Sequence, residues 1–136
     1  MRESDCIFCK LASGEIPTTT LYEDEDFKVI LDLSPASKGH ALIIPKEHYK
    51  NIYDLDETIA AKAMVLAKRM VIRLTEVLHC EGYNIVQNNN EVAGQTVFHF
   101  HMHLIPRYEG DKVGLGWKMG ELTEQDKQEI LEKLKK

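Results

Sequence analysis

The sequence predicts an α+β fold, in which a five-stranded antiparallel sheet carries one long helix on one face and short helices lie near the ends of the chain. Residues 95–106 alternate between polar and apolar side chains, which is the period of a strand. Residues 54–80 repeat apolar side chains at steps of three and four, which is the period of a helix. Four shorter stretches have the composition of strands, so we expect five strands, with residues 99–105 near the middle of the sheet.

Length and composition indicate one globular domain over residues 1–136. The chain is 43% apolar and 29% charged, as ordinary soluble proteins are. No apolar run approaches the ~20 residues that span a bilayer, and no basic-then-apolar leader opens the chain, so we expect no membrane partner and a cytoplasmic location. The net charge of −5 argues against nucleic acid as a partner, because such a surface would carry a basic stripe.

The N-terminal stretch, residues 4–14, predicts a short helix that Ser4 or Asp5 caps and that its last glycine ends. Cys6 and Cys9 form a C-x-x-C pair within it. That spacing alone is compatible with redox chemistry, with a metal site or with neither. Thioredoxin-like chemistry expects a preceding strand, and a metal would need two further ligands. An odd number of cysteines without a secretory signal argues against a disulfide framework.

The next two strands are predicted at Tyr22 and at residues 27–31, joined by the acidic turn 23–26. Asp32 follows the second strand, where an Asp can simply cap the turn. Residues 38–45 are almost continuously apolar after Gly39 and His40. They predict a third strand in the centre of the sheet.

The long helix is predicted over residues 54–80, with Asp54 or Asp56 as its N-cap and Gly82 as its stop. Its apolar stripe is typical of a core-facing surface rather than of a cofactor site. The stripe consists of Ile59, Ala63, Leu66, Met70, Leu74 and Val77. Cys80 is expected to fill space.

Residues 83–88 predict the fourth strand, and a polar turn leads from it into the histidine run. Strict alternation puts His99, His101 and His103 on one face of a strand. The other face then holds Phe98, Phe100, Met102 and Leu104. A His-rich edge strand without function is the alternative, but three imidazoles in register form a specific pattern. A neutral imidazole is both a nucleophile and a proton carrier near pH 7, because its unperturbed pKa is about 6.5.

On these residues the chain resembles the histidine triad (HIT) family, and most closely its zinc-containing Hint branch, from Cys6 to about Arg107. The resemblance implies a HIT core over residues 5–107, a C-terminal extension over 108–136 and a two-fold homodimer. It implies a hydrolase that cleaves purine nucleoside phosphoramidates through a covalent nucleotidyl-histidine. Two alternatives remain: a diadenosine polyphosphate hydrolase or nucleotidyl transferase, and a nucleotide-binding interaction protein with incidental hydrolysis.

The resemblance also implies roles for individual residues. His101 is the expected nucleophile, and His103 would donate to a phosphate oxygen. Gln95 would position phosphate or nucleophile, and the hydroxyl of Thr96, where the family commonly has Ser, would reach the leaving atom. The implied nucleotide-binding residues are Ile7, Phe8, Leu11 and Ile30 around the base, Asp32 at the ribose, and Asn88 and Gly94 at the ribose and phosphate.

A structural zinc ion is implied in the same way. In zinc-containing members, the first histidine of the triad joins a Cys pair and a further His, which match Cys6, Cys9, His48 and His99 here. Such a Cys2His2 set fills all four places of a tetrahedral zinc. The alternative is a pair of reduced, packed thiols. No acidic cluster suited to Mg²⁺ and no Walker loop accompanies the triad, which disfavours metal-assisted phosphoryl transfer.

Three further features remain open at this point. His40 resembles a family position that helps to hold the site, and it is equally compatible with a structural role. Trp117 either reaches a dimer partner's site, as the C-terminal segment does in the Hint branch, or covers a local apolar patch. Thr123 begins a capping signature and predicts a last, highly charged helix.

Overall fold

The computed structural model describes residues 3–135 and consists of one five-stranded antiparallel sheet with helices on both of its faces. The strands are β1 Thr20–Glu23, β2 Phe27–Leu31, β3 Ala41–Pro45, β4 Gly82–Val86 and β5 Met102–Arg107. The helices are α1 Ile7–Ser13, α2 Glu57–Leu78 and α3 Glu124–Leu134, with a short 3₁₀ turn at Glu91–Ala93. The strands follow the order β1-β2-β3-β5-β4, so the predicted fold class is confirmed.

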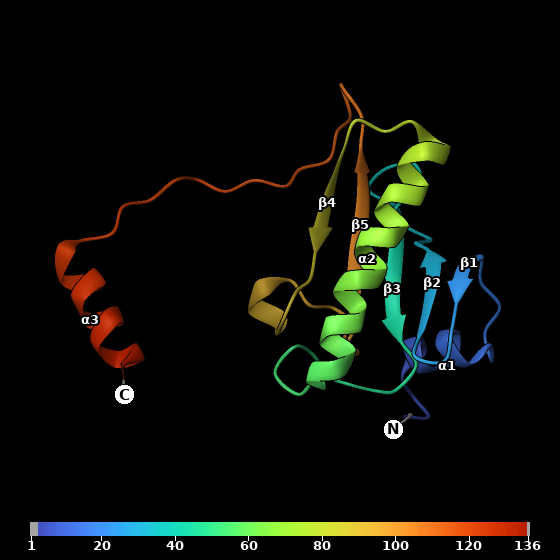
Figure 1. The fold of residues 1–136 in the computed structure, drawn as a ribbon, viewed down its shortest axis with the longest axis horizontal. Coiled ribbons are helices and arrows are strands. Elements are labelled where there is room, and N and C mark those ends of the chain that lie inside the picture. Colours follow the sequence, from blue (N-terminus) through green and yellow to red (C-terminus); the bar gives the residue numbers. More distant parts are fainter. Residues whose placement is uncertain (1–2, 136) are drawn as a thin grey trace.

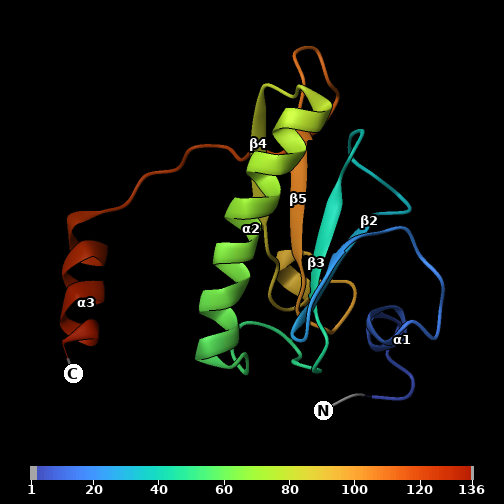
Figure 2. The same cartoon turned by 45° about the vertical axis from the view of Figure 1, so that its right-hand side comes forward.

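The two faces of the sheet pack against different helices (Figures 1 and 2). On one face, α2 covers alternate residues of the inner strands, among them Phe27, Ile43 and Leu104. On the other face, Phe8 and Leu11 of α1 pack with residues that include Ile30, Leu42 and Ile44. Alternation along each strand divides its side chains between these two cores.

The histidine run forms less strand than its pattern predicts. We expected a strand over residues 99–105, but β5 begins at Met102. Antiparallel pairing of β3 with β5 stops at Ile43 and Met102. Continued by two residues, the same register would bring Pro45 opposite Phe100. Pro45 has no N–H to donate to the ladder, and its carbonyl accepts a hydrogen bond from Nε2 of His99 at 2.8 Å. Phe98 is also misplaced by the prediction, because it is 41% exposed instead of joining Phe100 in the core.

The long helix is confirmed with shorter bounds than 54–80. Asp56, one of the two predicted caps, accepts the N–H of Ile59 through its carboxylate at 3.1 Å. Asp54 instead accepts the N–H groups of Lys50 and Asn51 in the preceding turn. The prediction for Val77 is wrong, since it is 62% exposed and the neighbouring Leu78 packs on the core.

The first helix is confirmed, but its predicted cap is wrong. Neither Ser4 nor Asp5 caps α1. Cys6 does, because its sulfur accepts the N–H of Cys9 at 3.3 Å. The helix ends at Gly14, whose φ of 86° lies in the left-handed region that favours glycine. Strands β3 and β4 also begin or end within three residues of the predicted 38–45 and 83–88.

The C-terminal helix stands apart from the rest of the chain. Figure 1 shows α3, in red, at the end of an extended segment that leads away from the sheet. Thr123 caps it as predicted, with its hydroxyl accepting the N–H of Asp126 at 3.1 Å, and every residue of α3 is exposed. Among the described residues, no helix is long and apolar enough to cross a membrane.

Candidate functional site

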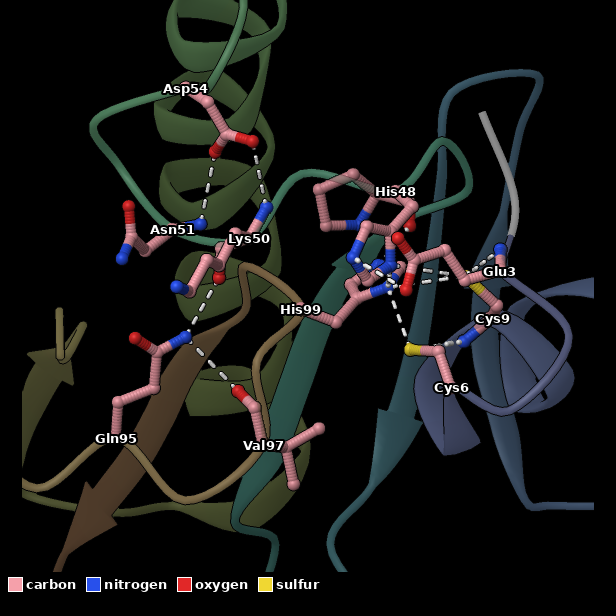
Figure 3. A network of polar contacts seen from close by, with 11 residues as sticks. Glu3, Cys6, Cys9, His48, Lys50, Asn51, Asp54, Gln95, Val97 and His99 are labelled. Atoms are coloured by element: carbon pink, nitrogen blue, oxygen red, sulfur yellow. Dashed lines mark hydrogen bonds and ion pairs between the residues drawn. The ribbon is translucent and has the colours of Figure 1, made fainter. Parts of the chain in front are cut away.

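The N-terminal helix and the histidine run meet in a compact cluster of two thiols and two imidazoles (Figure 3). Cys6 and Cys9 come from the cap and first turn of α1, and His48 follows β3. The Nδ1 atom of His99 lies 3.3 Å from the sulfur of Cys6 and 3.5 Å from that of Cys9. The Nδ1 atoms of His48 and His99 are 3.2 Å apart. All four predicted metal ligands therefore converge on one point.

The contacts of His99 and His48 leave the Nδ1 atom of each ring facing the sulfurs. His99 donates its Nε2 proton to the carbonyl of Pro45, so Nδ1 keeps a lone pair that faces the sulfurs. The Nε2 atom of His48 lies 3.7 Å from a carboxylate oxygen of Glu3. Burial lowers the pKa of His99 to about 4, which keeps its ring neutral at pH 7. Metal-bound histidines commonly direct their second nitrogen at an oxygen in this way.

This donor set fits Zn²⁺. Two sulfurs and two imidazole nitrogens lie within 4.8 Å of one another, with no further side chain needed to complete a tetrahedron. Thiolate and imidazole are the ligands that zinc prefers. The cluster could thus hold a zinc ion that joins α1 to the histidine run.

His101 lies beside this cluster with one defined nitrogen available for chemistry. Its Nδ1–H donates to the carbonyl of His99 at 2.7 Å, so Nε2 carries the lone pair. The ring packs edge-on against Phe8 of α1, with centroids 4.7 Å apart. Burial lowers the pKa of His101, which keeps the imidazole unprotonated at neutral pH.

A second chain of hydrogen bonds sets the protonation of His103. The N–H of Ala36 donates to Nδ1 of His40 at 2.9 Å, which places the His40 proton on Nε2. That nitrogen is 2.9 Å from Nδ1 of His103 and 3.5 Å from a carboxylate oxygen of Asp32. His103 accepts on Nδ1 and therefore carries its own proton on Nε2. Asp32, His40 and His103 also lie close enough to ligate a metal, but a protonated Nε2 on His40 offers no lone pair for one.

A cavity of about 310 Å³ opens onto His101 and His103 between α1 and the sheet. The predicted site residues that line it are Ile7, Phe8, Leu11, Ile30, Asp32, Thr96, His101 and His103. It is mostly apolar with a few polar groups, as ligand sites are. A larger cavity of about 620 Å³ lies between the β1–β2 turn and α2, and no histidine or cysteine lines it.

Three predicted site residues, Asn88, Gly94 and Gln95, lie in the loop before Thr96 and do not line the cavity beside His101 and His103. Gln95 is 2% exposed, and its amide donates to the carbonyls of Lys50 and Val97 (Figure 3). Its oxygen accepts the N–H of Asn90 at 2.8 Å, so the side chain is committed to the loop. Gly94 has a φ of 97°, and a Cβ there would lie 3.7 Å from the amide nitrogen of Asn88.

The structure adds cavity residues that the sequence did not indicate: Thr18, Leu31, Leu33, Leu42 and Val97. Leu42 belongs to a continuously apolar strand, in which no alternation marks the face of each side chain. Thr18 reaches the cavity through the pairing of β1 with β2, and turn length alone does not reveal that register. Trp117 is 88% exposed on the extended segment.

Comparison with known proteins agrees with the histidine pattern. The HIT domain family matches residues 13–110. Adenosine 5′-monophosphoramidase HNT1 of Saccharomyces cerevisiae is 40% identical, over 97% of this chain and 84% of that protein. Adenylylsulfatase HINT3 of Arabidopsis thaliana is 38% identical, over 80% of this chain and 55% of that protein. A crystal structure of a zinc-bound histidine triad family protein from Mycobacterium smegmatis, 36% identical, superposes with a TM-score of 0.77 over 96% of both chains.

Proposed function

Because the chain belongs to the HIT domain family, we propose that it cleaves purine nucleoside phosphoramidates through a covalent nucleotidyl intermediate on His101. Relatives at about 40% identity are named adenosine 5′-monophosphoramidase and adenylylsulfatase, which supports a nucleotide hydrolase. The observation that carries the proposal is the hydrogen bond from Nδ1 of His101 to the carbonyl of His99. It leaves Nε2 as the free nucleophile of a residue that lines the cavity.

The reaction proceeds in two displacements at the α-phosphorus. Nε2 of His101 forms a bond to phosphorus as the bond to the leaving amine breaks. The hydroxyl of Thr96 gives its proton to the amine and regains one from the water that attacks in the second displacement. The imidazolium that results keeps its Nδ1–H on the His99 carbonyl, which stabilises the positive charge. Nε2–H of His103 donates to a nonbridging oxygen, where negative charge accumulates. Water then attacks phosphorus, breaks the bond to Nε2 and releases the nucleoside monophosphate.

The nucleotide lies along the cavity. Ile7, Phe8, Leu11 and Ile30 contact the base through apolar surface. Asp32 accepts hydrogen bonds from the ribose hydroxyls, although one of its oxygens already accepts the N–H of Ser34 at 2.8 Å. Asn88 and Gly94 contact the phosphate side from the loop before Thr96, and Gln95 positions that loop through its buried amide.

Zn²⁺ bound by Cys6, Cys9, His48 and His99 would have four protein ligands and no open position, so it supplies stability rather than a Lewis acid. The ligands themselves tie the start of α1 to His99. Phe8 lies between the two cysteines in sequence and contacts the ring of His101. The cluster therefore positions one wall of the nucleotide cavity.

Replacing His101 by Asn tests the function. Turnover of adenosine 5′-monophosphoramidate should fall by about 10³-fold or more, because Asn cannot form the covalent intermediate. Binding of AMP, measured by calorimetry, should stay within about threefold, since the rest of the cavity is retained. His79→Asn is the matched control: His79 is exposed at the end of α2, with a φ of 54° that Asn tolerates.

An active His101→Asn enzyme would contradict the proposal. The preferred leaving group is found by comparing the turnover of phosphoramidates, adenylyl sulfate and diadenosine polyphosphates by the unmodified protein. If a dinucleotide is cleaved faster than every phosphoramidate, the protein is instead a diadenosine polyphosphate hydrolase, which acts on a phosphoanhydride bond.

A further inference from the structure

One residue in the wall of the active-site cavity carries a buried hydroxyl that has no hydrogen-bond partner. Oγ1 of Thr18 is buried and unpaired, and among the described residues only the hydroxyl of Tyr83 shares that state. A buried donor or acceptor without a partner costs free energy, so such groups are rare and call for an explanation. Thr18 lines the same cavity as Asp32, His101 and His103.

The sheet order places Thr18 at the end of the cavity that is farthest from the imidazoles. His103 lies on β5, and the strands follow the order β1-β2-β3-β5-β4. Thr20 pairs with Ile30, and the N–H of Leu31 donates to the carbonyl of Thr19, so the same register continues to Thr18 opposite Asp32. Three strand spacings of about 4.8 Å put roughly 14 Å between the segment of Thr18 and β5.

This order fixes how a nucleotide would lie. With its phosphorus at His101 and its ribose at Asp32, the base is directed toward the segment before β1. Apart from Thr18, the cavity residues from α1 and from β2, the strand next to β1, include Leu11, Ile30 and Leu31, which offer only apolar contact. Thr18 therefore supplies a polar side-chain group that can recognise the edge of the base.

We propose that the Thr18 hydroxyl forms a hydrogen bond with the edge of the purine base and thereby contributes to base affinity. The inference rests on the proposed use of this cavity for a nucleotide. The hydroxyl is buried where it stands, so contact with the base requires rotation about χ1, which exchanges the hydroxyl with the methyl group on the same carbon. Because the hydroxyl has no partner to leave, this rotation breaks no hydrogen bond. A hydroxyl both donates and accepts, so it suits either kind of atom on a purine edge.

Thr18→Val removes the hydroxyl and keeps the shape of the side chain. Calorimetry with AMP should show about 3- to 10-fold weaker binding, the effect of one hydrogen bond. Binding of ribose 5-phosphate, which lacks the base, should stay unchanged. Thr18→Ser retains the hydroxyl and should bind AMP as the unmodified protein does. Thr19→Val, at the exposed neighbouring position, is the matched control and should change neither affinity.

Turnover and stability provide separate readouts. Thr18→Val should raise KM and leave kcat unchanged, because the base is remote from the reacting bond. Its Tm should equal or exceed that of the unmodified protein, since a buried, unpaired hydroxyl has been removed. If Thr18→Val fails to fold, Thr18→Ala replaces it with the same expectations for AMP and ribose 5-phosphate.

Equal weakening of AMP and ribose 5-phosphate, or unchanged AMP affinity in Thr18→Val, overturns the inference. The proposed hydrolase function fails in a different way. If AMP binding depends on Thr18 but no phosphoramidate is cleaved, the base contact stands and the function falls. If phosphoramidates are cleaved and Thr18→Val alters nothing, the function stands and the base contact falls.

Discussion

Backbone groups determine which imidazole nitrogen is free at each histidine of the run. The carbonyl of Pro45 accepts a hydrogen bond from Nε2–H of His99, and the carbonyl of His99 accepts one from Nδ1–H of His101. Adjacent members of the run therefore expose opposite nitrogens: Nδ1 of His99 toward the thiols, and Nε2 of His101 for the proposed attack on phosphorus. The N–H of Ala36 sets the proton of His40 and, through it, that of His103. Ring position follows from alternation in the sequence. The tautomers depend on hydrogen bonds that alternation does not reveal, two of them to residues more than 50 positions away.

Replacing His103 should reduce the acid sensitivity of the fold. Burial, and then the nearby His101 and His40, lower the pKa of His103 to about 4, whereas it is near 6.5 when unfolded. The unfolded chain therefore binds the extra proton first, and stability is lost as pH falls from about 6.5 to about 4. Thermal unfolding at pH 7.5 and pH 4.5 should show a larger loss of Tm for the unmodified protein than for His103→Gln. An equal loss of Tm in both proteins would contradict the lowered pKa of His103.

Removing one thiol should remove the zinc. Cys9→Ser should lower zinc from about one ion per chain and lower Tm by on the order of 10 °C, because ligand binding contributes to folding. Cys80→Ser is the matched control, since Cys80 is also buried but lies outside the cluster, with Thr75 as its partner. Elemental analysis and thermal unfolding measure both effects. Unmodified protein without zinc, at full stability, would favour the alternative of two packed thiols.

At the scale of elements, the sequence predicted the faces of the strands better than their ends. Phe100, Met102 and Leu104 lie in the core under α2, as alternation requires. The predicted start of β5 was wrong because the hydrogen-bond ladder between β3 and β5 ends where Pro45 lacks an N–H. That constraint comes from a strand more than 50 residues away in the sequence. The predicted cap of α1 was wrong because the sulfur of Cys6 accepts the backbone N–H hydrogen bond that a Ser or Asp oxygen usually accepts at a helix start.

The two longer helices offer a paired test of capping. Asp56→Ala should lower the free energy of unfolding by about 1 kcal/mol, because it removes the cap of a helix that packs on the core. Thr123→Ala removes a cap with the same 3.1 Å geometry from α3, every residue of which is exposed. Chemical denaturation should therefore detect the first change and not the second. A loss of stability in Thr123→Ala would contradict the exposed position of α3.

At the scale of the whole molecule, β4 leaves one edge of the sheet open. It pairs with β5 on one side and is the last strand in the order. Unpaired strand edges invite pairing with a second chain. We expect two copies to join along β4 in a two-fold dimer, in line with the family resemblance.

Ile85→Lys tests this assembly, since Ile85 lies on β4 and is 43% exposed. Sedimentation equilibrium should find a dimer for the unmodified protein and a shift toward monomer for the variant. A lysine on β4 of each copy would bring like charges together along the paired edge and oppose pairing. Val92→Lys, at a 99% exposed position away from the strand, is the control. A monomeric unmodified protein would refute the expectation.

His99 belongs to two constructions at once. Its ring lies in the cluster with Cys6 and Cys9, and its backbone carbonyl accepts the hydrogen bond of His101, the proposed nucleophile. Any disturbance that loosens this residue, whether oxidation of the thiols or loss of an ion, would be transmitted to the reacting nitrogen through a single peptide unit. The activity proposed for His101 and the oxidation state of Cys6 and Cys9 would then both depend on the hydrogen bond between His101 and the His99 carbonyl.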